Sequence, residues 1–148
     1  MEDRYLYKAK RTDSEEWVVG SLISTPHGGY MIDRVADSRR FRVMINSSTI
    51  CQCTGLRDKN GKLIWENDIV KKEFFTDYEN YANSEEYIGI VEVMDCAWVI
   101  AETIKGHKCA RPIFESISYS KDVKHFEVIG NVFDNPELLE SEGQYDRE

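Results

Sequence analysis

The chain has 148 residues, 41% of them hydrophobic and 11% aromatic, which is enough for an ordinary hydrophobic core. No run of about 18 apolar residues is present, so we expect no membrane-spanning helix and no secretory leader. We therefore expect the protein to be cytoplasmic. The four cysteines are too few and too irregularly spaced for a disulfide framework, which fits a reducing compartment.

The charge is acidic, with 27 Asp or Glu against 19 Lys or Arg and a net of −8. Half of this excess lies in residues 137–148, and we expect 140–148 to form an acidic, flexible tail. The mildly acidic remainder gives no general attraction to a polyanion. Two small basic clusters remain along the chain, and their members are Lys8, Lys10 and Arg11, and then Arg34, Arg39, Arg40 and Arg42.

Most of the sequence is typical of β-strands, because runs of β-branched and aromatic residues alternate with Gly, Asn, Asp and Pro. The runs that we predict as strands are, in chain order, residues 5–10, 17–23, 30–32, 41–45, 49–54, 63–65, 69–75, 87–94, 97–100, 113–119 and 126–133. Short polar connections predict three hairpins, which pair 5–10 with 17–23, 41–45 with 49–54, and 87–94 with 97–100. Residues 33–40 are interpreted as a polar linker and residues 76–86 as a long polar loop.

The end of the last strand is followed by a helix signal. Asn135 suits a helix cap and Pro136 the first helical position, so we expect one helical turn over 137–139. The sequence therefore predicts an all-β, mainly antiparallel protein with a short C-terminal helical turn. We expect a single compact domain over residues 1–139, with two small barrel-like or sandwich halves at 1–54 and 55–139, the second resembling an SH3-like barrel.

Residues 54–70 contain two tight turns between apolar residues. In the first turn, Gly61 is expected to take a positive φ, and Asn60 can take one as well. Asn67 and Asp68 predict the second turn. The side chains of Asp58 and Asp68 are placed to accept hydrogen bonds from their own backbone, which gives both carboxylates a structural role.

This segment resembles the hallmark of the YopX family, small proteins encoded by phages and prophages of Gram-positive bacteria, which reads T-G-L-x-D-x-x-G-x-x-I-(aromatic)-E-G-D-I-V. It departs at Asn67, where the family usually has Gly, and Asn tolerates the left-handed conformation best among non-glycine residues. Residues 127–139 resemble the family's closing block, E-V-I-G-N-(I/V)-(aromatic)-(E/D)-N-P-E-L-L. The matched residues that we expect to serve the scaffold are Thr54, Gly55, Leu56, Asp58, Gly61, Ile64, Trp65, Glu66, Asp68, Gly130, Asn131, Asn135 and Pro136. The resemblance implies a shared scaffold but no established activity.

Catalytic patterns do not accompany these carboxylates. The sequence lacks a nucleophile elbow and a Gly-rich phosphate loop, so we predict that the protein is not an enzyme and needs no cofactor. A hydrolase or a metal-dependent enzyme is the weaker alternative, and the zinc ligands of the latter would be Cys51, Cys53, His107 and Cys109. The spacing of the first two is more typical of packed strand side chains than of a zinc knuckle, so we expect no metal.

A binding role is favoured instead. Tyrosines in or beside a long loop supply contact area at low entropic cost, and the candidates here are Tyr78, Tyr81 and Tyr87. We predict a phage or prophage accessory protein that acts through a protein partner or by self-association, with no membrane partner. The alternative is a nucleic-acid-associated module, which requires Arg39, Arg40 and their neighbouring arginines to converge on one exposed face.

Overall fold

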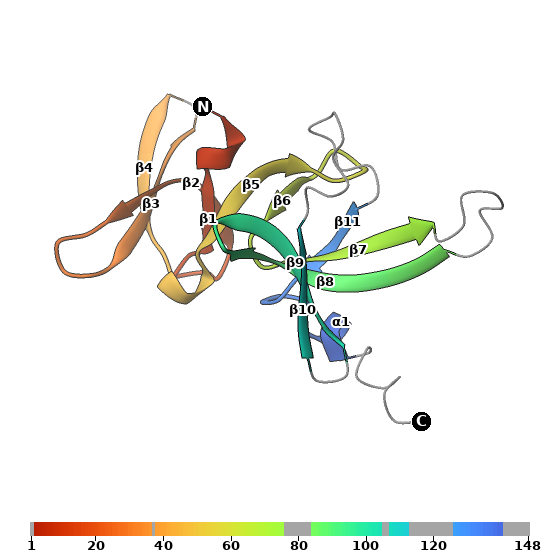
Figure 1. Ribbon diagram of the computed structural model, residues 1–148. Coiled ribbons are helices and arrows are strands. Elements are labelled where there is room, and N and C mark those ends of the chain that lie inside the picture. The colour runs from red at the N-terminus through yellow and green to blue at the C-terminus, as the bar shows by residue number, and fades with distance from the viewer. Residues whose placement is uncertain (1, 37, 76–83, 105–106, 113–125, 141–148) are drawn as a thin grey trace. The chain divides into compact units, whose positions relative to one another are not determined.

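Two antiparallel β-sheets make up most of the computed structural model, which describes residues 2–36, 38–75, 84–104, 107–112 and 126–140 (Figure 1). The chain divides into two compact units, Met1–Gly55 and Leu56–Glu148. The elements are η1 (Asp3–Tyr5), β1 (Tyr7–Lys10), β2 (Trp17–Ser24), β3 (Tyr30–Ala36), β4 (Arg39–Met44), η2 (Ser47–Thr49), β5 (Cys51–Arg57), β6 (Leu63–Trp65), β7 (Asp68–Phe75), β8 (Ser84–Met94), β9 (Ala97–Ile104), β10 (His107–Pro112), β11 (Phe126–Asn131) and α1 (Glu137–Glu140). The predicted all-β class is confirmed.

The strand orders are β4-β3-β2-β1-β5-β6 in the first sheet and β10-β9-β8-β7-β11 in the second. Each order is an open row, so neither sheet closes into a barrel within the described ranges. The SH3-like form expected for the second half is therefore not confirmed. In the described parts of the chain, no helix is long and apolar enough to cross a membrane.

The first predicted hairpin is confirmed, with β1 and β2 antiparallel and Ala9 opposite Val18. The interpretation of residues 33–40 as a linker is wrong, because β3 and β4 form a hairpin with Ser38 at a φ of 62° in its turn. Charged residues suit this hairpin because β4 is an edge strand whose side chains are largely exposed to water.

The predicted pairing of 41–45 with 49–54 is also wrong. β4 pairs with β3, whereas β5 pairs with β1. The cause is η2, where the Asn46 side chain accepts a hydrogen bond from the Ser48 N–H at 3.1 Å. This capped turn carries the chain away from β4 instead of reversing it beside that strand. The core of the first unit then forms from Ala9, Val18, Ile32 and Ile45, with Leu22, Val43 and Ile50 packed against it.

The hairpin predicted around Asp95 and Cys96 is confirmed in β8 and β9, and both residues take positive φ, 50° and 64°. Two consecutive positive φ values are those of a type I′ turn, whose twist matches that of paired strands. β8 starts at Ser84, so the predicted loop is too long at its C-terminal end. The rest of that loop, 76–83, and the predicted strand 113–119 lie outside the described residues, and β10 was not predicted.

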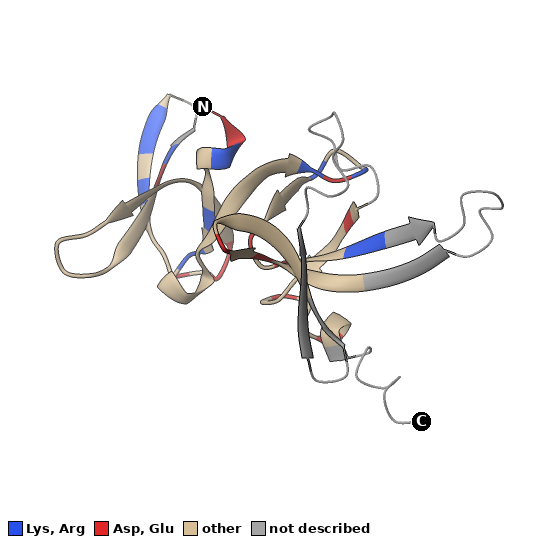
Figure 2. Cartoon of the chain, viewed as in Figure 1, with Lys and Arg blue, Asp and Glu red and all other residues tan. Residues whose placement is uncertain are grey.

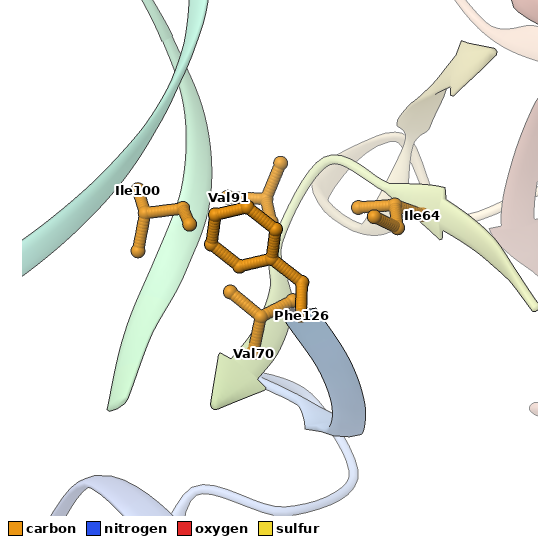
Figure 3. Close-up of a cluster of buried hydrophobic side chains, with 5 residues drawn as sticks. All are labelled: Ile64, Val70, Val91, Ile100 and Phe126. Carbon is orange, nitrogen blue, oxygen red and sulfur yellow. The ribbon is translucent and has the colours of Figure 1, made fainter. Parts of the chain in front are cut away.

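The core of the second unit is formed by strands that lie far apart along the chain. Figure 3 shows the Phe126 ring of β11 among side chains from β7, β8 and β9. The buried cluster consists of Ile64, Val70, Val91, Ile100 and Phe126, with Leu56, Trp98 and Val128 packed against it. β11 ends at Asn131, two residues before the predicted end, and α1 supplies the predicted helical turn.

Candidate functional site

The hallmark carboxylate of Asp58 is buried, with 3% of the residue exposed. Its Oδ1 accepts hydrogen bonds from the N–H groups of Asn60 and Lys62, both at 2.9 Å. Its Oδ2 accepts from the Val128 N–H at 3.0 Å. Gly61 has the predicted positive φ of 79°, whereas Asn60 does not take one. The carboxylate therefore holds the turn together and ties it to β11.

Asp68 has a similar role in the second turn. It is 2% exposed, and its Oδ2 accepts a hydrogen bond from the Trp65 N–H at 2.8 Å. Asn67 takes the left-handed conformation expected at the family's Gly position, with a φ of 66°. Its N–H donates to the Val91 carbonyl at 2.8 Å, and its carbonyl accepts from the Val132 N–H at 3.0 Å. This turn is thereby joined to β8 and to the end of β11.

The closing block is organised by two asparagines. The Asn131 Oδ1 accepts hydrogen bonds from the N–H groups of Phe133 and Asp134, each at 3.0 Å. The Asn135 Oδ1 accepts from the Asn131 N–H at 3.2 Å. A Cβ on Gly130 would lie 2.5 Å from that same Asn135 oxygen, so only glycine leaves room for this contact.

The other motif residues also belong to the scaffold. Thr54, Ile64 and Trp65 are buried, and Leu56 packs against the core of the second unit. Glu66 is half-buried, Gly55 has a φ of 77°, and the Pro136 carbonyl accepts a hydrogen bond from the Leu139 N–H at 3.1 Å. The motif thus stabilises turns, and its two buried aspartates are held by backbone amides.

The thiols of Cys51 and Cys53 are buried. The Cys51 Sγ donates to the Thr49 carbonyl at 3.3 Å, and the Cys53 Sγ accepts from the Gly55 N–H at 3.5 Å. Both contacts are those of small packed side chains. His107 and Cys109 lie in β10, but their side chains lie outside the described residues. Where side chains are described, no group of three or more His, Cys, Asp or Glu could hold a metal ion.

The predicted tyrosine surface falls mostly outside the described part of the chain. Tyr78 and Tyr81 are not among the described residues. Tyr87 lies in β8 opposite Lys72 of β7, but its side chain is not among those that the structure describes. These residues remain predicted interaction sites.

A hollow of about 430 Å³ opens on the surface of the first unit. Its lining residues include arginines, aromatic residues and one acidic residue, and we call it the basic hollow. The lining residues are Arg11, Glu16, Trp17, Val18, Arg34, Phe41, Arg42 and Val43. Figure 2 shows the basic segments of β4.

Strand register explains how β3 and β4 contribute to the basic hollow. Arg34 lies opposite Phe41, and the buried Ile32 lies opposite Val43. Residues two apart on a strand share a face, so Arg34 and Phe41 extend the face that buries Ile32. Phe41 nevertheless remains 45% exposed. The apolar face of the first sheet therefore continues into an open, charged surface.

Both basic clusters of the sequence contribute to this surface. Arg11, from the first cluster, lines the hollow with Arg34 and Arg42 from the second. The Nζ atoms of Lys8 and Lys10 lie 4.8 and 5.5 Å from the Trp17 ring, within cation–π range. Sequence reasoning missed this, because it sought basic residues next to Trp17 along the chain and not across the strand pair.

Two carboxylates balance the arginines. The Arg11 guanidinium donates to both carboxylate oxygens of Asp13, at 2.8 and 2.7 Å, and this hydrogen bonding lowers the pKa of Asp13 to about 2. Arg40 donates from Nε to Asp33 at 3.0 and 2.8 Å. That bonding, followed by the charge of Arg40 and of the nearby Arg42, lowers the pKa of Asp33.

The arginines of the second cluster do not share one face. Arg40 and Arg42 lie on one face of β4, whereas Arg39 lies on the other with Phe41. Of the four arginines that were expected to converge, only Arg34 and Arg42 are among the residues that line the basic hollow, and the register places Arg34 on the face of Phe41 and Arg42 on the opposite face, opposite Asp33. The single basic face required by the nucleic-acid alternative is therefore not formed by these four residues.

Together these features define an all-β scaffold with carboxylate-locked turns and an open surface hollow. A family model described as YopX protein matches residues 6–140. The chain belongs to the YopX family, as the motifs predicted.

Among solved structures, the chain is similar to the crystal structure of protein yopX from Bacillus subtilis, with 22% identity, 92% of this chain and 96% of that chain covered, and a TM-score of 0.55. Protein EF1440 from Enterococcus faecalis is also 22% identical over 90% of this chain and 96% of that chain, with a TM-score of 0.46. No curated protein matches the chain by sequence. The likeness to yopX extends to the fold alone.

Proposed function

We propose that this protein is a non-catalytic binding module that acts by contact with another protein. The observation that carries this proposal is the basic hollow, whose lining residues include Trp17, Phe41 and three arginines. Exposed aromatic and arginine side chains are the groups that dominate binding energy at protein interfaces. The structural use of Asp58 and Asp68 supports a non-enzymatic role, because both carboxylates are occupied by backbone N–H groups.

The charge balance favours a protein partner over a nucleic acid. Residues 1–55 contain eight Lys or Arg and seven Asp or Glu, a net of +1. Glu16 lines the hollow, and Asp13 and Asp33 pair with Arg11 and Arg40. Binding of a phosphate backbone draws on many positive charges over an extended surface, and the net charge of residues 1–55 is only +1. A protein segment that carries both apolar and charged groups fits such a surface better.

The YopX motifs support a biological setting for this role. The resemblance to the YopX family implies that the protein is an accessory protein encoded by a phage or prophage. We therefore propose that the interaction takes place in the cytoplasm of a bacterial host. Self-association belongs to the same proposal, since a second copy of the chain is also a protein partner.

The test is an affinity capture of the tagged full-length chain from bacterial lysate, with and without nuclease. The variant R34A/R42A removes two charges from the hollow, and Arg4→Ala removes an exposed charge of the first unit that does not line it. We expect the wild-type chain to capture one defined protein even after nuclease treatment. The Arg4→Ala variant should still capture this protein, whereas R34A/R42A should not. The proposal would be contradicted if only nucleic acid were recovered and nuclease abolished that recovery. Equal capture of the protein by the wild-type chain and both variants would also contradict it.

A further inference from the structure

We infer that the outer edge of β4 receives an extended acidic segment of the partner protein as an added antiparallel strand. The side chains of that segment would then meet the arginines of β3 and β4 and the Phe41 ring. This inference rests on the proposed function and names the chemical class of its partner. It adds a binding mode, strand addition, that the basic hollow alone does not specify.

The edge itself is open over most of its length. β4 is the terminal strand of the first sheet, and in the described part of the chain it pairs only with β3. Its last carbonyl, that of Met44, accepts a hydrogen bond from the Thr12 N–H at 3.2 Å. Residues 39–43 therefore present the edge, and a sheet edge carries N–H and C=O groups that a further strand can pair with.

The residues of β4 disfavour pairing of this edge with β4 of a second copy of the chain. Arg39, Arg40 and Arg42 lie within four residues of each other on β4. Two β4 strands paired across a two-fold axis would bring six guanidinium groups together, and like charges on neighbouring strands are destabilising. Charged residues on edge strands commonly prevent such self-pairing. An acidic strand reverses the sign of this interaction and is therefore the favoured occupant.

Both faces of the added strand would meet positive charge. Arg39 lies on the same face of the hairpin as Arg34 and Phe41, and Arg42 lies on the other face, where Arg40 is paired with Asp33. Arg34 makes no ion pair within the described ranges, so its guanidinium is available to a carboxylate there. The exposed Phe41 ring suits an aromatic residue at the centre of the segment.

The test uses defined probes on the folded full-length chain. The probe is a fluorescent peptide in which Glu alternates with Val around a central Tyr, and binding is followed by anisotropy. Three control probes are the same peptide with Lys for Glu, the same peptide N-methylated at alternate residues, and oligothymidylate of equal length. N-methylation removes the backbone donors that strand addition needs and leaves the side chains in place.

We expect the acidic peptide to bind and its affinity to fall with added salt. Binding should weaken about tenfold in R34A/R42A and remain unchanged in Arg4→Ala. Both peptide controls should bind at least about tenfold more weakly than the acidic peptide. Thermal unfolding of each variant verifies that the fold is intact, and the peptide controls require no variant at all.

Two results would overturn the inference. Equal binding of the N-methylated peptide would rule out strand addition while leaving the hollow as a protein-binding surface. Oligothymidylate binding more tightly, with the same dependence on Arg34 and Arg42, would assign the site to nucleic acid and would remove the proposed function as well. The two failures are therefore distinguishable.

Discussion

Asp58 shows how much one side chain contributes to this fold. Its carboxylate accepts three backbone hydrogen bonds, and one of them comes from Val128, 70 residues away along the chain. The turn-forming role of Asp58 is readable from the sequence, because a segment such as Asp58-Lys59-Asn60-Gly61, with Asp at its start and Asn-Gly at its end, is typical of turns. The bond to Val128 is not readable, since nothing local indicates which strand will pass beside the turn.

Replacing Asp58 with Ala leaves three N–H groups without their acceptor at a buried position. We expect the free energy of unfolding to fall by about 2–4 kcal/mol, measured by urea denaturation. Asp134→Ala is the matched control, because Asp134 is exposed, and its loss should cost less than about 1 kcal/mol. A loss for Asp58→Ala as small as that of the control would contradict a locking role.

Asp13 provides a prediction for pH. Its bidentate pairing with Arg11 lowers the pKa of the carboxyl from 3.8 to about 2. Because the folded-state pKa is the lower one, the pair stabilises the fold above pH 3.8, and this contribution disappears as pH falls toward 2. An NMR titration of the Asp13 carboxyl carbon should give a midpoint near 2. A midpoint at the ordinary value would mean that the pair does not persist in solution.

At the scale of elements, turns were easier to predict than pairings. The β8–β9 hairpin was predictable because Asp95 and Cys96 separate two β-rich runs. The β3–β4 hairpin was missed because its strands carry arginines and aspartates, a composition that is also typical of linkers. Charged strands become stable at a sheet edge, and edge position is a property of the whole sheet that local sequence does not encode.

The Asn67 turn yields a test of the one departure from the family hallmark. With a φ of 66°, Asn67→Gly removes the steric cost of a Cβ, whereas Asn67→Ala keeps that cost and loses the asparagine side chain. We expect Asn67→Ala to lower the free energy of unfolding by about 1 kcal/mol and Asn67→Gly by less. A greater loss for Asn67→Gly would show that the asparagine side chain, and not the backbone conformation, is what this turn requires.

Gly130 tests the contact between β11 and the segment before α1. A Cβ there would lie 2.5–2.9 Å from three atoms of the Asn135 side chain. We expect Gly130→Ala to cost about 1–3 kcal/mol in urea unfolding. The double variant G130A/N135A removes two of the three clashing atoms, Oδ1 and Cγ of Asn135, and should cost less than the sum of the two single variants. Strict additivity would mean that the two residues do not contact each other as described.

At the scale of the molecule, charge is divided unequally between the two units. Residues 1–55 carry a net of +1, which leaves −9 for residues 56–148 when the whole chain is at −8. The average charge of the sequence therefore conceals a first unit that is not acidic. Arg11 and Arg34 could not be placed at one hollow from the sequence, because their meeting depends on β1, β2 and β3 lying side by side.

The central claim is that the basic hollow of the first unit binds a partner protein. The most direct measurement is the affinity of the nuclease-resistant captured protein for the wild-type chain, R34A/R42A and Arg4→Ala, across a series of salt concentrations. We expect an affinity about tenfold lower for R34A/R42A, a weaker salt dependence in that variant, and no change for Arg4→Ala. Equal affinity for all three chains would place the binding surface elsewhere on the molecule and contradict the account.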